Sequence, residues 1–296
     1  MNKFAIITDS GSDLEPELRE RYGVELVPMY YIIEEIPYEA DLSWQDFSAK
    51  EFYDMMRDGK KMRTAQVKKE SFTELYKKLF EDGLDVLYLA TSSNISASGD
   101  VGRVAWEELK TGYPDRKVVV VDTLRACYAL GLLVIRASEL REEGKTIEQT
   151  AEWIEQNKLT VNMEGSVDKL TYLKNAGRVS ATSAFFGGLL NIKPIIIADA
   201  QGRNFACEKV RGRRMSFERL AERIAERYLD VPHQKMFISH ADCYDEAVEL
   251  KNMVIEKIGK DIDVHIGYVG PCVGASVGPG QVGVYFYGKE VTDNKL

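Results

Sequence analysis

Four consecutive valines, Val118 to Val121, restrict the fold of this chain more than any other feature. They follow Lys117 in an apolar run that shows no alternation of apolar and polar residues. A strand with one face in water alternates, whereas a strand covered by helices on both faces reads as a continuous apolar run. The valine run therefore predicts an α/β fold built on a parallel sheet.

Two earlier runs, Phe4–Thr8 and Asp85–Ala90, have the same character, and helical patterns separate the three. One predicted helix covers Glu15–Tyr22, and another begins near Ser43 and Asp46. A repeated alternation of strand and helix is typical of parallel α/β domains. We predict that residues 1–157 form an N-terminal α/β domain with a parallel sheet.

The pattern changes near Lys158, which marks the start of a second predicted domain, residues 158–296. Two strand candidates, Lys193–Asp199 and Phe205–Arg211, flank the turn residues Ala200-Gln201-Gly202, which predicts an antiparallel hairpin. Further helices and strands alternate to the end of the chain. The expected C-terminal domain is α/β with a mixed or antiparallel sheet, and a helix over Thr146–Gln156 is its expected connector.

The charge balance argues against two classes of partner. The 296 residues include 39 basic and 47 acidic side chains, a net charge of −8. General nucleic-acid binding and adhesion to anionic membranes both require a positively charged protein surface. Nothing resembles a secretory leader or an apolar run of about 18 residues, and the four cysteines are widely spaced. We expect a cytoplasmic protein with reduced thiols.

Small hydroxylic residues follow each predicted strand of the N-terminal domain, in Thr8-Asp9-Ser10, Thr91-Ser92-Ser93 and Asp122-Thr123. Ligands of open parallel sheets bind beyond the carboxyl ends of the strands, so the three segments predict a hydroxyl-rich rim. Helix capping is the alternative explanation for each segment taken alone.

Motifs that carry catalysis are not found in the sequence. It has no nucleotide-binding glycine loop, no GxSxG and no HExxH, and its three histidines lack metal-type spacing. We expect no metal and no cofactor. His240, at the end of a strand, is interpreted as a structural imidazole. Asp9 is the single candidate for a general base should the rim serve an enzyme.

Three further segments have a functional and a structural interpretation. Lys174–Arg178 and Lys209–Arg214 are basic islands on an acidic chain, which suits either a partner or a solvated surface. Ser183–Leu190 reads SAFFGGLL and suits either core packing or the wall of an apolar site. Paired glycines destabilise a helix interior by ~1 kcal/mol each unless something must approach closely.

Several motifs, in order along the chain, resemble those of the DegV family. The opening Thr8–Leu14 is similar to that family's T-D-S-x-[SA]-D-L, and Leu190–Ile195 to its L-L-x-I-K-P-I. Weaker matches are Arg63–Lys68 to K-T-S-Q-P-S, Ser92–Ser98 to S-S-x-L-S-G-T, and Leu170–Arg178 to L-x-x-L-x-x-G-G-R. The resemblance covers essentially the whole chain.

This resemblance implies a two-domain protein, not itself an enzyme, that binds a long-chain fatty acid in an interdomain tunnel. It also implies that the protein presents the carboxylate to a separate fatty acid kinase subunit. The family's carboxylate-binding threonine and serine correspond to Thr64 and Ser96, and its kinase-docking arginines to Arg178 and Arg211. Side chains expected to form part of the apolar wall are Phe185, Phe186, Leu189, Leu190 and Ile192.

One family residue has no counterpart. Ser276-Val277-Gly278-Pro279-Gly280 stands where the family has H-T-G-P-G, so Ser276 replaces a histidine. A serine can still donate a hydrogen bond, but it is shorter and carries no charge. We include Ser276 in the expected head-group site. The alternatives are an enzyme that uses the hydroxyl-rich rim on a small substrate, and a regulator with a vestigial lipid pocket.

Overall fold

The three apolar runs of the N-terminal half are neighbouring strands of one parallel sheet. They appear in a computed structural model that describes residues 3–179 and 191–293. The strands lie in the order β2 (Val24–Val27), β1 (Phe4–Asp9), β6 (Asp85–Ala90) and β7 (Val118–Asp122), and every neighbouring pair is parallel. The predicted α/β class is confirmed.

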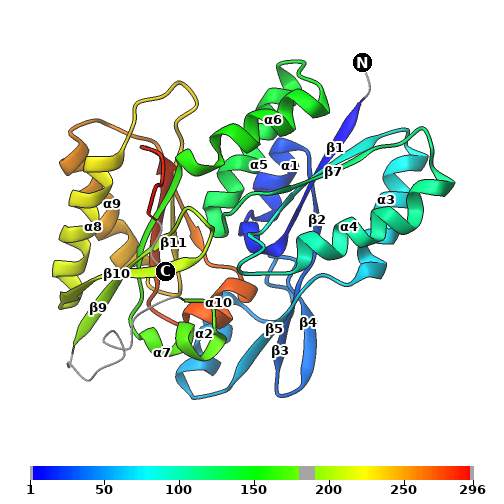
Figure 1. Ribbon diagram of the computed structural model, residues 1–296. Helices are drawn as coiled ribbons and strands as arrows, with labels where there is room; N and C mark the ends of the chain where they lie inside the picture. Colours follow the sequence, from blue (N-terminus) through cyan, green and yellow to red (C-terminus); the bar gives the residue numbers. More distant parts are fainter. Residues whose placement is uncertain (1–2, 180–190, 294–296) are drawn as a thin grey trace.

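Helices cover both faces of this sheet, which explains why its strands show no alternation. Ile6 and Leu87 pack toward α5 (Cys127–Glu142) and α6 (Ile147–Asn157), with α1 (Pro16–Tyr22) beside them. Ile7 and Tyr88 pack toward α3 (Lys69–Glu81) and α4 (Ser98–Leu109). Figure 1 shows α3 and α4 on the outer side of the sheet and α5 between this sheet and the C-terminal one.

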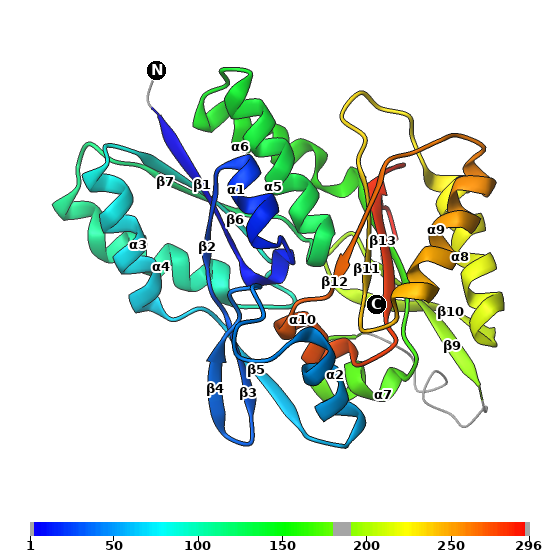
Figure 2. The same cartoon turned by 180° about the vertical axis from the view of Figure 1, so that it is seen from behind.

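A small antiparallel sheet, not foreseen from the sequence, lies beyond the parallel one (Figure 2). It consists of β4 (Ile36–Glu39), β3 (Tyr30–Ile33) and β5 (Met62–Ala65). The apolar run Val24–Ile33 is thus two strands, β2 and β3, interrupted at Pro28, which cannot donate to a sheet ladder.

The helix predicted to begin near Ser43 and Asp46 begins later, as α2 (Ala49–Arg57). The Asp41 carboxylate accepts hydrogen bonds from the Ser43 backbone N–H, at 2.9 Å, and from its hydroxyl, at 2.6 Å, which holds a local turn there. A capping box between Ser48 and Glu51 then starts the helix.

The C-terminal half contains a six-stranded mixed sheet. Its order is β10 (Asn204–Arg211), β9 (Ile192–Ala198), β8 (Val161–Ser166), β13 (Val282–Tyr287), β11 (Met236–His240) and β12 (Val264–Tyr268). The predicted β9–β10 hairpin is antiparallel, and only β11 and β12 pair in parallel. One face packs on α8 (Arg213–Arg227) and α9 (Tyr244–Ile258), and the other on α5.

Two short helices of the C-terminal half, α7 (Leu170–Ala176) and α10 (Pro271–Val277), pack against the N-terminal half. Three 3-10 turns complete the described elements: η1 (Ser10–Ser12), η2 (Lys110–Gly112) and η3 (Lys158–Thr160). Among the described residues, every helix is too short or too polar to cross a bilayer. The domain boundary at residues 157 and 158 stays a prediction.

Candidate functional site

A pocket of about 440 Å³ lies between the parallel sheet and the C-terminal sheet. The N-terminal half contributes the end of β5 and the loops that follow β6 and β7, at the carboxyl edge of the sheet. The C-terminal half contributes β8, β9, the start of β13 and one side of α10. This volume is within the range of small-molecule sites, and apolar side chains such as Met163, Ile196 and Val273 form much of its wall.

The pocket brings together the three hydroxyl side chains expected at a head-group site. Thr64 comes from β5, Ser96 from the loop before α4, and Ser276 from the last turn of α10, and all three line the same space. Thr64 and Ser276 are 212 residues apart in the sequence, so only the fold can bring the three together. Within the described ranges, Thr64 Oγ1 and Ser276 Oγ have no hydrogen-bond partner, so both remain available to a ligand.

Ser96 is held in place by a short hydrogen-bond chain. Its Oγ lies 2.9 Å from Ser98 Oγ and accepts from the Ser98 backbone N–H at 3.2 Å, while Ser98 Oγ accepts from the Val67 N–H at 3.2 Å. When the Ser98 hydroxyl donates to Ser96, the Ser96 proton is free to point into the pocket. Ser96 also precedes α4, whose N-terminus favours an anion.

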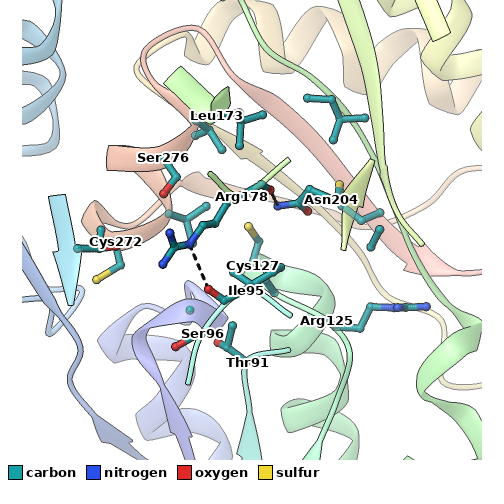
Figure 3. Close-up of a pocket in the computed structure, with 18 of the residues that line it drawn as sticks. Thr91, Ile95, Ser96, Arg125, Cys127, Leu173, Arg178, Asn204, Cys272 and Ser276 are labelled. Carbon is teal, nitrogen blue, oxygen red and sulfur yellow. Dashed lines mark hydrogen bonds between the residues drawn. The ribbon is translucent and has the colours of Figure 1, made fainter. Parts of the chain in front are cut away.

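Arg178 adds a cation to the same end of the pocket. Its Nε donates to the Ile95 carbonyl at 3.3 Å and one Nη donates to the Ala176 carbonyl at 2.7 Å. Figure 3 shows its guanidinium between the segments that carry Ser276 and Ser96. We expected Arg178 only at a docking surface, so its place on the pocket wall was missed.

A second cavity, of about 1040 Å³, adjoins this end of the pocket. Thr64, Arg178 and Ser276 line both spaces. The second cavity is bordered by charged residues, among them Glu34, Glu35, Lys60, Lys61 and Arg63. The hydroxyl-rich end of the pocket therefore adjoins a polar region, whereas its other end lies against the C-terminal sheet.

Two N-terminal side chains hold the start of α10. Asp13 Oδ1 accepts from the Gly270 N–H at 3.0 Å, and the Tyr53 hydroxyl donates to the Val269 carbonyl at 2.8 Å. Asp13 is almost fully buried, and this burial raises the pKa of its carboxyl group well above the usual value. Asp13 and Tyr53 thus fix the helix that carries Ser276.

The other side chains of the hydroxyl-rich rim form hydrogen bonds within the protein. The Thr8 hydroxyl donates to the Leu89 carbonyl, and the Thr123 hydroxyl to the Ala90 carbonyl. Asp9 is buried, and its two oxygens accept from Gly11 N–H, Thr91 N–H, the Thr91 hydroxyl and the Tyr88 hydroxyl, at 2.5–3.0 Å. A carboxylate so fully bonded is a poor general base, and the structural explanation of these segments is favoured.

Arg125, which follows β7, is a fully buried cation that the sequence did not single out. Its Nε donates to the Val161 carbonyl at 2.7 Å, and one Nη donates to the carbonyls of Leu124, at 2.7 Å, and Asp199, at 3.3 Å. Burial lowers the pKa of Arg125 to about 10, so it stays charged at neutral pH. It ties the β7–α5 loop to both β8 and the β9–β10 turn.

His240 and the two thiols that line the pocket are not activated for catalysis. His240 is buried, its Nδ1 accepts from the Cys243 N–H at 3.3 Å, and burial lowers its pKa, in keeping with a structural imidazole. All four cysteines are free, and burial raises the pKa of the two thiols that line the pocket, Cys127 and Cys272. Residues 3–179 and 191–293 contain no cluster of three His, Cys, Asp or Glu side chains suited to a metal.

Other expected residues lie elsewhere. Ile192 is not among the described residues that line the pocket; it shares the strand and parity of Ile196 but lies about 13 Å further along β9. The described residues therefore give no support to its place on the wall, which stays a prediction. Arg211 is exposed at the end of β10, away from the pocket. The remaining wall candidates, Phe185, Phe186, Leu189 and Leu190, lie outside the described residues.

Fold and site together define a class: an α/β protein with a largely apolar pocket between two sheets and hydroxyl groups with a guanidinium at one end. A family model described as "Uncharacterised protein, DegV family" matches residues 3–289. A DegV domain-containing protein of Clostridium perfringens is 34% identical over 97% of this chain and 98% of its own length. The chain belongs to the DegV family.

Solved structures of similar proteins have the same fold. A DegV lipid-binding protein of Thermotoga maritima is 29% identical, covers 98% of this chain and 99% of its own, and superposes with a TM-score of 0.84. A DegV family protein of Thermus thermophilus, whose structure was described for its fatty acid binding, is also 29% identical, covers 97% and 99%, and has a TM-score of 0.85.

Proposed function

We propose that this protein binds a long-chain fatty acid, with the acyl tail in the pocket between the sheets and the carboxylate at Thr64, Ser96 and Ser276. The observation that carries the proposal is that these three hydroxyl groups line one pocket, which also has many apolar side chains. Fatty acid binding is also described for a structural relative that is 29% identical.

The physical chemistry of the pocket suits such a ligand. A tail of about 15 methylenes gains roughly 12 kcal/mol on burial, against an association cost of about 4–15 kcal/mol. A carboxylate leaves water only where donors replace its hydration. Thr64, Ser96 and Ser276 supply three hydroxyl donors to the carboxylate. Arg178 supplies a positive charge near them, which can form a charge-assisted hydrogen bond with the carboxylate.

The carboxylate contacts can be tested with two ligands of equal tail. We expect the wild-type protein to prefer stearic acid to octadecanol, because only the acid forms charged hydrogen bonds. The double variant Thr64→Val, Ser96→Ala should weaken stearic acid about 100-fold, since two such bonds contribute ~1.5 kcal/mol each, and octadecanol less than about threefold. Displacement of a fluorescent fatty acid measures both.

The matched control is Ser93→Ala, because Ser93 lies on the same loop but is exposed and outside the pocket. It should bind both ligands as the wild type does. Equal weakening of acid and alcohol in the double variant would contradict a carboxylate at these hydroxyls.

We further propose that the bound carboxylate is presented to a separate fatty acid kinase subunit, so that the protein binds its ligand without catalysing a reaction. The cavity shared by Thr64, Arg178 and Ser276 supports this idea, because it gives a second protein a route to the head group. Arg211, exposed on β10, is the proposed docking residue, together with Arg178.

Ser276 provides the test of presentation. The variant Ser276→His places a longer side chain, able to carry a positive charge, beside the carboxylate. We expect acyl-phosphate formation by a bacterial fatty acid kinase subunit with ATP to rise at least about 10-fold, because a charged donor stabilises the developing charge. Mass spectrometry of the acyl-phosphate measures it, and an unchanged rate together with unchanged stearic acid affinity would contradict the role given to this position.

A further inference from the structure

A polar group lies on the pocket wall at the C-terminal sheet. Gln281 immediately precedes β13, and Tyr285 lies within it. Both are on the same face of the strand as Gly283, and both line the pocket. The intervening Val282 and Val284 pack on the opposite face, in the core with α8 and α9. The strand therefore directs an amide and a hydroxyl into a pocket that is otherwise largely apolar.

Gly283 allows these two side chains to converge. A Cβ at this glycine would lie 2.7 Å from the Tyr285 hydroxyl oxygen and 2.8 Å from Gln281 Nε2, closer than real Cβ contacts permit. Ser239 of β11 lies opposite Gly283 in the sheet register. Gln281, Tyr285 and Ser239 therefore form one cluster on the sheet face that lines the pocket.

The hydrogen bonds of this cluster do not satisfy Gln281. Ser239 Oγ lies 2.9 Å from the Tyr285 hydroxyl, but 3.4 Å from Gln281 Nε2 and 3.5 Å from Oε1. An amide has two donors and an acceptor oxygen, and a single hydroxyl cannot satisfy them in either orientation of the amide. Gln281 is only 6% exposed, so water outside the protein cannot complete its bonds.

We infer that Gln281, with the Tyr285 hydroxyl beside it, binds a hydrogen-bonding substituent on the acyl chain, so that the protein accepts hydroxylated fatty acids. This inference rests on the proposed function and extends it to a ligand class. A hydroxyl on the chain normally weakens binding to an apolar pocket, because it loses its hydration. Opposite Gln281 the same hydroxyl meets an amide whose hydrogen bonds to Ser239 are long, at 3.4 and 3.5 Å.

A series of hydroxystearic acids that differ only in the carbon bearing the hydroxyl tests the inference, with stearic acid as reference. We expect the wild-type protein to bind one position at least as tightly as stearic acid, and the others about 10-fold more weakly. In Gln281→Leu, and in Gln281→Met should the first fold poorly, the favoured position should become as weak as the others. Isothermal titration measures the affinities.

Gln156→Leu is the matched control, because Gln156 is exposed on α6 and lies outside the pocket. It should keep the wild-type profile. The inference is overturned if every hydroxyl position weakens binding equally in the wild type, or if Gln281→Leu keeps the positional preference. Failure of stearic acid itself to bind would instead overturn the proposed function on which the inference rests.

Discussion

Ala198→Trp is expected to abolish fatty acid binding while the protein remains folded. Ala198 lies at the end of β9 with its side chain on the pocket wall, so an indole there fills space that the tail would occupy. Tryptophan is compatible with a strand, and the pocket volume of about 440 Å³ leaves room for the ring. We predict a loss of stearic acid affinity of at least about 100-fold, since most of the affinity comes from tail burial.

The control for this variant is Ile192→Trp on the same strand. Ile192 does not line the pocket, so the same ring at that position should leave stearic acid binding within about threefold of the wild type. Circular dichroism of both variants checks that each is folded. Wild-type affinity in a folded Ala198→Trp protein would mean that the tail lies elsewhere.

Arg125→Met is expected to cause a large loss of stability. The guanidinium donates to the carbonyls of Val161, Leu124 and Asp199, none of which methionine can satisfy. Hydrogen bonds to charged groups contribute ~1.5–3 kcal/mol each, and a buried acceptor left unpaired adds a penalty. We expect the free energy of unfolding to fall by at least about 4 kcal/mol, measured by urea denaturation.

Arg103→Met gives the comparison for this measurement. Arg103 pairs with Asp100 on the surface of α4, with 42% of its side chain exposed, and such pairs contribute little. Its replacement should change the free energy of unfolding by less than about 0.5 kcal/mol. A similarly small change for Arg125→Met would contradict the conclusion that its buried hydrogen bonds stabilise the contact between the two halves.

Local patterns in the sequence were sufficient for the parallel sheet and the β9–β10 hairpin. Val118–Val121 has no alternation because α4 and α6 cover both faces of β7. The continuous apolar run was therefore enough to predict a strand between two layers of helices. The small sheet of β3, β4 and β5 was missed because its strands are four residues long and its third strand is distant along the chain. Short strands with remote partners carry little periodicity.

The candidate site was less accessible to such reasoning. Thr64, Ser96 and Ser276 were located through the family resemblance, since no spacing links three hydroxyls on separate elements. Arg125 and Gln281 were missed because their surroundings are formed by distant segments, Val161 and Asp199 for one and Ser239 for the other. The glycine between Gln281 and Tyr285 was the available signal, because an interior strand glycine often marks a close approach.

Native mass spectrometry of the protein as purified tests the central claim most directly. The claim is that a largely apolar slot between two sheets holds one acyl chain by its tail and binds the acid end with hydroxyl groups. We predict one added mass of a fatty acid per wild-type chain, present on isolation or after incubation with stearic acid, and none in Ala198→Trp. A wild-type protein that stays ligand-free under both conditions, or an Ala198→Trp protein that carries the same mass, would contradict the claim.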